Sequence, residues 1–218
     1  MWVVTCPEAT LFRVCEGRGF DDAKTLLDAD YSGVLVRDGW APYRSYTKAT
    51  HQSCIAHLAR RAHELKIQLP SDQARFPVAV AKILDEALAW RDEQRPLAAR
   101  VDAADMLGLR LADICRGPFI GEPNRRFAKH LTREHDAIFT FLTRDNDAAN
   151  WRGEQAIRPA VVNRKTFGGN RTDKGASTLS VITSVLVTAT QRGHAALDIL
   201  VRSARARAPA PVLAFPIN

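Results

Sequence analysis

The sequence predicts an α/β fold that carries a helical insertion. Over residues 1–65, short β-branched and apolar runs typical of strands alternate with segments of helical spacing. Residues 76–142 then keep helical spacing with no strand-like run between them. The chain has 218 residues, of which 46% are hydrophobic, so it can bury a sizeable core. This size favours one compact unit with an insertion over two equal domains.

The amino-terminal elements are predicted from local composition. Residues 2–5 and 10–15 are β-branched and apolar, and the turn signal at residues 6–9 between them predicts a hairpin. Residues 21–28 have helical spacing. The apolar run at residues 33–37 predicts a short buried strand that ends at Asp38.

The middle of the chain is predicted to be mostly helical. Residues 51–55 suit another short strand, and residues 56–65 suit a helix with one apolar side. Residues 76–104 and 125–142 have helical periodicity, with a break at Pro96. We expect these two stretches to form the insertion.

The last third predicts two helices and a tail. Asn150 suits the N-cap of a helix of about two turns that carries Glu154 and ends before Pro159. Residues 177–191 are apolar on most sides and predict a buried helix, with Gly193 as its left-handed cap. Beyond Val201 the tail is basic and rich in proline.

Charge and composition restrict the partners. Lys plus Arg exceed Asp plus Glu by 31 − 24 = 7, which favours a polyanionic partner such as nucleic acid, although a basic protein without such a ligand has the same balance. No window offers the ~18 to 20 apolar residues that span a bilayer, and the start lacks a signal-peptide pattern. We therefore expect a cytoplasmic protein with no membrane partner. The four cysteines form no CxxC pair, which favours reduced thiols.

Two acids are candidates for metal-dependent phosphodiester chemistry. Glu154 lies in a basic segment that ends in a Gly-Gly turn, and Asp38 stands at the exposed end of a predicted strand. Each has a simpler interpretation. Asp38 before Gly39 is a common turn signal, and Glu154 can form an i,i+4 pair with Arg158 that contributes only ~0.2 to 0.5 kcal/mol. The acids are 154 − 38 = 116 positions apart, so they meet only if the chain returns after an insertion.

The basic residues after Glu154 are the best candidates for contact with a DNA backbone. Gly168 and Gly169 allow backbone N–H groups to approach a phosphate, although a flexible basic loop has the same composition. Phe167 is the only aromatic residue among these cations, so they have no array of rings on which bases could stack. We therefore expect this segment to position a DNA strand without reading its bases. The candidates are Arg158, Arg164, Lys165, Arg171 and Lys174.

A possible zinc pattern is also present. His51, Cys54 and His57 form H-x-x-C-x-x-H, but they supply only three ligands, and the predicted change from strand to helix would separate them.

Three segments together resemble a known family. They are YSGVLVRDGWAPY (31–43), HQSCIAHLARRAHEL (51–65) and NWRGEQAIRPAVVNRKTFGGNRTDKGA (150–176), and they resemble the transposases of the IS66 insertion-sequence group. They stand in the family's order, and similarity covers nearly the whole chain, including SVLVTATQRGHAALDIL near the end.

This resemblance implies a DDE-type transposase with an RNase H-like core. In that family two Asp and one Glu bind two divalent metals, Mg²⁺ or Mn²⁺, and the enzyme cuts and joins DNA strands. Asp38 matches the second Asp and Glu154 the Glu. The family's first Asp lies upstream of the segment that matches residues 2–5, so we expect this sequence to begin after it, and neither Glu8 nor Glu16 stands at the matching position.

The resemblance also suggests supporting residues. The pattern C-x-A-H-x-x-R-R is a family signature near the active site, which implies that its members pack and position DNA or the catalytic acids. In this sequence the expected active-site support is Cys54, His57, Arg60 and Arg61, together with Asn150. A solvated helix face is the simpler interpretation of the two arginines.

The expected organisation follows from these matches. Residues 1–68 form the first part of the core, 69–146 the helical insertion, 147–201 the second part of the core and 202–218 the tail. We expect a nucleoid-associated, truncated transposase that is inactive alone, binds transposon ends, and self-associates or pairs with full-length transposase. Two alternatives stay open: a catalytically dead remnant that binds DNA or restrains intact transposase, and a mis-assigned start upstream of which the missing strand is encoded.

Overall fold

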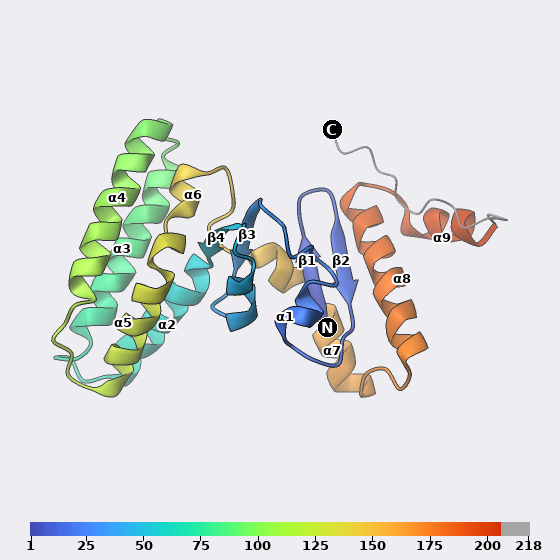
Figure 1. Ribbon diagram of the computed structural model, residues 1–218, viewed down its shortest axis with the longest axis horizontal. Helices are drawn as coiled ribbons and strands as arrows, with labels where there is room; N and C mark the ends of the chain where they lie inside the picture. Colours follow the sequence, from blue (N-terminus) through green and yellow to red (C-terminus); the bar gives the residue numbers. More distant parts are fainter. Residues whose placement is uncertain (206–218) are drawn as a thin grey trace. The chain divides into compact units, whose positions relative to one another are not determined.

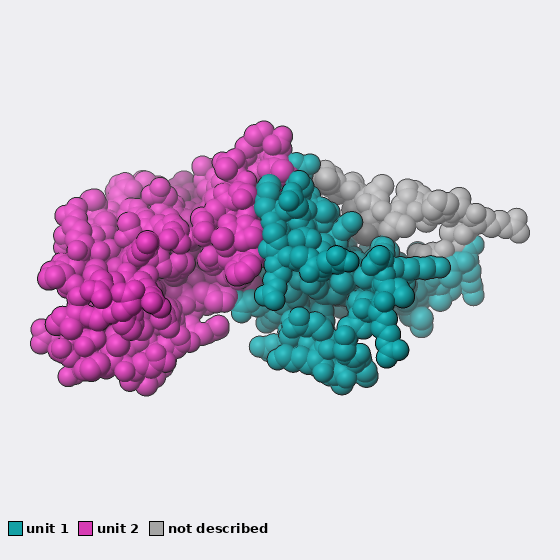
Figure 2. All heavy atoms as spheres, turned by 60° about the horizontal axis from the view of Figure 1, so that its bottom comes forward, with its two compact units in different colours: residues 1–28, 151–218 teal, residues 29–150 magenta. Residues whose placement is uncertain are grey.

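The computed structural model describes residues 1–205, which adopt a mixed α/β fold (Figure 1). The chain forms two compact units (Figure 2). The first comprises Met1–Asp28 and Trp151–Asn218, described as far as Arg205, and the second comprises Ala29–Asn150. Strand pairing produces a two-stranded sheet in each unit. The predicted tail at 202–218 lies outside the described residues, except for its first four.

The first unit contains the predicted hairpin. Strands β1 (Trp2–Thr5) and β2 (Thr10–Arg13) pair antiparallel, with Trp2 opposite Arg13. A single helical turn, α1 (Phe20–Ala23), follows and is shorter than the predicted helix over residues 21–28. Three longer helices complete the unit: α7 packs on β1, α8 on β2, and α9 on α8. They are α7 (Trp151–Phe167), α8 (Asp173–Gln191) and α9 (Ala196–Arg205).

Helix α7 does not end before Pro159, and that prediction is wrong. The helix runs on to Phe167, with Pro159 exposed inside it. Proline removes one helical N–H and crowds the preceding turn. Contacts of α7 with β1 hold the helix in spite of that cost. Glu154 therefore stands in the first turn of a helix of 17 residues, whose last turn carries Arg164 and Lys165.

Helix α8 is not the apolar buried helix that its composition predicts. Its buried residues are mostly small and polar, whereas Val181 is 57% and Ile182 41% exposed. The hydroxyls of Ser180, Ser184 and Thr188 recur every four residues, so they share one face of the helix. They accept hydrogen bonds from the backbone N–H groups of Val14, Phe12 and Thr10, at 2.9, 2.8 and 3.1 Å respectively. The face of α8 is polar because it satisfies the open edge of β2.

The second unit begins with a parallel strand pair. Strand β3 (Val34–Arg37) pairs with β4 (Thr50–Ser53), and Arg37 lies opposite Ser53. Both strands were predicted, although β4 ends two residues before the predicted end, because Ile55 already begins the next helix. The 3₁₀ helix η1 (Ala41–Ser45) lies in the connection between them.

Helices make up the rest of the second unit. Pro96 separates α3 from α4, as predicted, but the stretch predicted over 125–142 is interrupted by a 3₁₀ turn. The elements are α2 (Ile55–Gln68), α3 (Arg75–Asp92), α4 (Leu97–Ile114), α5 (Glu122–Glu134), η2 (His135–Ala137) and α6 (Thr140–Thr143).

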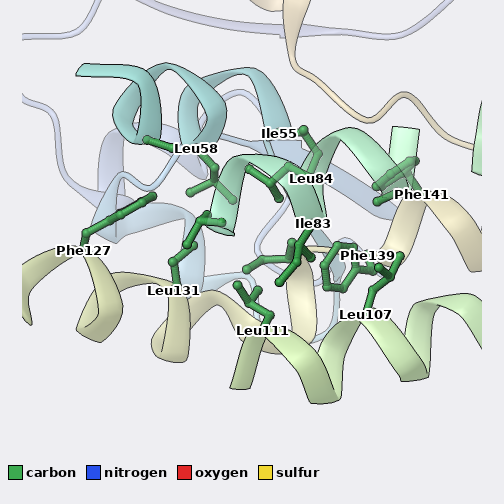
Figure 3. Close-up of a cluster of buried hydrophobic side chains, with 14 of the residues drawn as sticks. Ile55, Leu58, Ile83, Leu84, Leu107, Leu111, Phe127, Leu131, Phe139 and Phe141 are labelled. Atoms are coloured by element: carbon green, nitrogen blue, oxygen red, sulfur yellow. The ribbon is translucent and has the colours of Figure 1, made fainter. Parts of the chain in front are cut away.

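An apolar core holds these helices together (Figure 3). Leu58, Ala62 and Leu65 recur at helical spacing on α2 and are at most 3% exposed. They pack in one cluster with Ile83 and Leu84 of α3 and with buried side chains of α4, α5 and α6. The helices of the predicted insertion thus share a core with α2. Among residues 1–205, no helix combines the length and apolar character needed to cross a bilayer.

Candidate functional site

Strand β3 places Asp38 at the carboxyl end of the parallel pair. The N–H of Cys54, just after β4, donates to the carbonyl of Arg37 at 2.8 Å, so both strands end at the same edge. Asp38 is partly exposed, and its Oδ1 accepts a hydrogen bond from the N–H of Trp40 at 2.9 Å. The carboxylate is thus held by an Asx-type turn at a strand end, where its remaining oxygen lone pairs can serve a ligand.

Two aromatic residues follow Asp38. Trp40 is 46% exposed, whereas Tyr43 in η1 is half-buried. Burial, the charge of Asp38 and the neighbouring Tyr46 raise the pKa of Tyr43 to about 12. The Tyr43 hydroxyl therefore stays protonated at neutral pH and can donate a hydrogen bond.

An ion pair lies immediately behind the Asp38 turn. The Glu134 carboxylate on α5 bonds to the Arg37 guanidinium, accepts from Ser53 Oγ at 2.8 Å, and lies 3.5 Å from Arg44. Burial opposes ionisation of Glu134, but the hydrogen bonds from Arg37 and Ser53 and the Arg37 charge outweigh it and lower its pKa. Arg37 also donates to the Asp38 carbonyl at 3.2 Å. The network therefore fixes the backbone that carries Asp38.

Sequence reasoning missed this network. Its one signal was Arg37, a charge that ends an apolar strand and needs a buried partner. Nothing local marks Glu134 as that partner, because it lies 97 positions away.

After its long helical excursion, the chain returns to the carboxyl end of the β3–β4 pair. The N–H of Ile55 donates to the Ala148 carbonyl at 3.0 Å, and the N–H of Asn150 reaches Cys54 Sγ at 3.4 Å. Asn150 and Cys54 therefore lie together, at the sheet edge where Asp38 begins its turn. Glu154 follows Asn150 by four positions in the sequence.

The other expected supporting residues lie on α2. His57 is in its first turn and partly exposed, while Arg60 and Arg61 are exposed. Arg61 lies 3.4 Å from Glu64, the arrangement of a solvated helix face. Their support of an active site stays a prediction.

The zinc pattern finds no support at His51. Its Nδ1 accepts from Arg37 Nε at 3.0 Å and its Nε2 lies 3.0 Å from the Tyr46 carbonyl. Both ring nitrogens are thus occupied within the protein. Burial lowers the pKa of His51, which suits a neutral ring in this position.

Glu154 and the basic candidates belong to the first unit. Glu154 is partly exposed in the first turn of α7. The positive φ of Gly168 (+78°) and Gly169 (+87°) turns the chain between α7 and α8. All five basic candidates are exposed, and no ion pair to a described residue engages Arg158, Arg164, Lys165, Arg171 or Lys174.

Comparison with known proteins identifies the family. The family model described as "Transposase IS66 family" matches residues 1–178. The chain therefore belongs to the IS66 transposase family.

A curated relative covers more sequence than this chain. "Uncharacterized protein y4qI" of Sinorhizobium fredii is 26% identical over 220 residues, which cover 90% of this chain and 40% of the relative. The chain thus spans about 40% of the length of that relative. No solved structure matches the chain.

Proposed function

We propose that this chain supplies the second Asp and the Glu of a DDE transposase site, with Asp38 and Glu154 in those roles. The observation that carries the proposal is the position of Asp38, held at the carboxyl end of a parallel strand pair to which the chain returns before Glu154. Family membership supports the transposase class.

The proposal includes an RNase H-like core. An antiparallel hairpin followed by a parallel strand pair is the strand sequence that such a core contains. In our proposal, residues 1–68 and 147–201 form the core, and residues 69–146 are a helical insertion.

The two acids suit a hard divalent cation. Carboxylate oxygens are the donors that Mg²⁺ and Mn²⁺ prefer, and both side chains are partly exposed. When bound, two such ions stabilise the attacking and leaving oxygens of a phosphodiester displacement. Asp38 and Glu154 would hold them. We expect these 218 residues to cut DNA poorly alone, because the family's shared first Asp has no match among them.

The exposed turn after α7 would bind the DNA backbone. Five cations that form no ion pair with a carboxylate of residues 1–205 lie within 174 − 158 + 1 = 17 residues, and two glycines there expose the backbone. Such contacts position a strand without reading its sequence. We place the protein on cytoplasmic nucleoid DNA, where it would self-associate or pair with a longer transposase.

The test is a titration of Mn²⁺ into the purified chain, read by thermal stability and by nicking of a labelled duplex. The variants are Asp38→Ala and Glu154→Ala, and the exposed acids Asp105→Ala and Glu16→Ala serve as matched controls. Stabilisation by Mn²⁺ that only the first two variants abolish supports the joint site. A response that survives in both variants contradicts it. DNA binding with no Mn²⁺ response would favour the alternative, a dead remnant that binds DNA or modulates intact transposase.

A further inference from the structure

We propose that Phe167 is a stacking platform for an unpaired DNA base. The inference rests on the DNA-binding role proposed for the turn after α7, and it adds a base contact to a surface that otherwise offers only charge.

Phe167 lies at the exposed end of helix α7. It is the last residue of α7 and 79% exposed, more than any other large hydrophobic side chain in the described part of the chain. Two glycines of positive φ follow it, and the N–H of Gly168 closes the helix by donating to the Arg164 carbonyl at 3.0 Å. The ring therefore projects from a helix end that is itself hydrogen-bonded.

The surroundings of Phe167 are polar and cationic. Within residues 163–174 it is the only apolar side chain apart from alkyl stems. Arg164, Lys165, Arg171 and Lys174 are exposed around it in sequence, against one acid, Asp173. The Cγ of Arg164 lies 3.8 Å from the position that a Cβ on Gly169 would take, so this guanidinium stem packs on the turn.

This combination matches a nucleic-acid ligand better than a protein one. An apolar docking site needs neighbouring apolar side chains, and a lone ring among cations supplies none. A nucleic-acid ligand uses both the cations and the ring, because cations neutralise the phosphates and an aromatic face stacks on a base. A paired base inside a duplex is covered on both faces, so the favoured ligand is an unpaired base at a strand end, nick or distorted junction.

The test compares two short duplexes that differ only in whether a fluorescent adenine analogue is paired or unpaired. Binding and quenching are measured for the wild-type chain, Phe167→Ala, Phe167→Leu and Phe167→Trp, with Leu197→Ala as the control because Leu197 is 70% exposed on the same unit. We expect Phe167→Ala and Phe167→Leu to weaken binding of the unpaired base about 5- to 150-fold, and the paired duplex much less. Phe167→Trp should retain the preference, and Leu197→Ala should change nothing.

A second variant separates this inference from the function on which it rests. Arg164→Ala should weaken both duplexes alike and reduce the slope of log affinity against log salt by about 0.7 to 0.9. The stacking role would be overturned if Phe167→Ala still preferred the unpaired base, or if Phe167→Leu kept the full affinity for it. Either result would leave the proposed DNA binding intact. Failure of the wild-type chain to bind either duplex would overturn both proposals.

Discussion

Arg37 and Glu134 form a buried ion pair across 97 positions of sequence. The Glu134 side chain is 0% and the Arg37 side chain 5% exposed. Through this pair, helix α5 is joined to the end of β3, and Arg37 in turn donates to the carbonyl of Asp38. The position of a candidate metal ligand therefore depends on a side chain from the helices of the second unit.

The first prediction concerns removal of one partner of this pair. Glu134→Gln keeps the shape of the side chain but leaves the Arg37 charge buried and uncompensated, so it should lower the free energy of unfolding by about 3 to 5 kcal/mol. Urea unfolding followed by tryptophan fluorescence measures the change. The double variant Arg37→Met/Glu134→Leu should recover much of the loss, and equal stability of the double and single variants would contradict the pairing.

The second prediction is a pH dependence of the same pair. The pKa of Glu134 is lower in the folded chain than its ordinary value of 4.5. As the pH falls below 4.5, the unfolded chain takes up the proton first, so the stability that Glu134 contributes is present above this pH and is lost below it. The free energies of unfolding of the wild type and Glu134→Gln should differ at neutral pH and approach each other as the pH falls to about 3. The other carboxyl groups affect both proteins equally. A difference in unfolding free energy that stays the same at every pH would therefore contradict the role of the Glu134 charge.

The sequence allowed prediction of elements whose signals are local. Strands β1 to β4, helix α2 and the break at Pro96 all follow from composition and spacing over a few residues. The extension of α7 through Pro159 could not be predicted, because contacts with β1 decide whether the cost of the proline is tolerated. The polar face of α8 likewise depends on the open edge of a strand more than 160 positions away.

The candidate site was likewise predictable only where its signals are local. Asp38 could be located because an apolar strand runs directly into an Asp-Gly turn. The ion-pair partner behind this turn could not be located, since Glu134 comes from a distant helix, α5, with no local mark of its target. Long-range pairing, rather than side-chain type, was the missing information.

The third prediction concerns the glycine after Asp38. A Cβ on Gly39 would lie 2.7 Å from Cε1 of His130, closer than real contacts permit. Gly39→Ala should therefore force the end of the half-buried His130 side chain to move and destabilise the second unit by about 1 kcal/mol. Gly108→Ala is the control, because its Cβ would meet His135 at an ordinary 3.5 Å. If His130→Ala fails to relieve the effect of Gly39→Ala in the double variant, the clash is not its cause.

The fourth prediction tests the hydroxyl face of α8. Ser184→Ala leaves the buried N–H of Phe12 without its acceptor, which should cost about 1 to 3 kcal/mol. Replacing Ser180, Ser184 and Thr188 together by alanine should also open the edge of β2 and promote self-association. Thr178→Ala, on the exposed side of the same helix, is the control. Light scattering and urea unfolding measure the two effects, and a monomeric triple variant would show that the hydroxyls do not protect the edge.

The fifth prediction compares two prolines that lie at different positions of their helices. Pro159 lies inside α7, where it removes an N–H and crowds the preceding turn, whereas Pro123 stands at the start of α5, where no intrahelical partner is lost. Pro159→Ala should therefore raise the stability of the first unit by up to about 3 kcal/mol, and Pro123→Ala should leave the second nearly unchanged. Thermal unfolding and helical circular dichroism give the comparison.

Because α7 carries Glu154 at one end and Phe167 at the other, a gain in stability accompanied by weaker DNA binding would mean that Pro159 sets the direction of the helix for function. Equal effects of both substitutions would instead show that Pro159 imposes no helical strain.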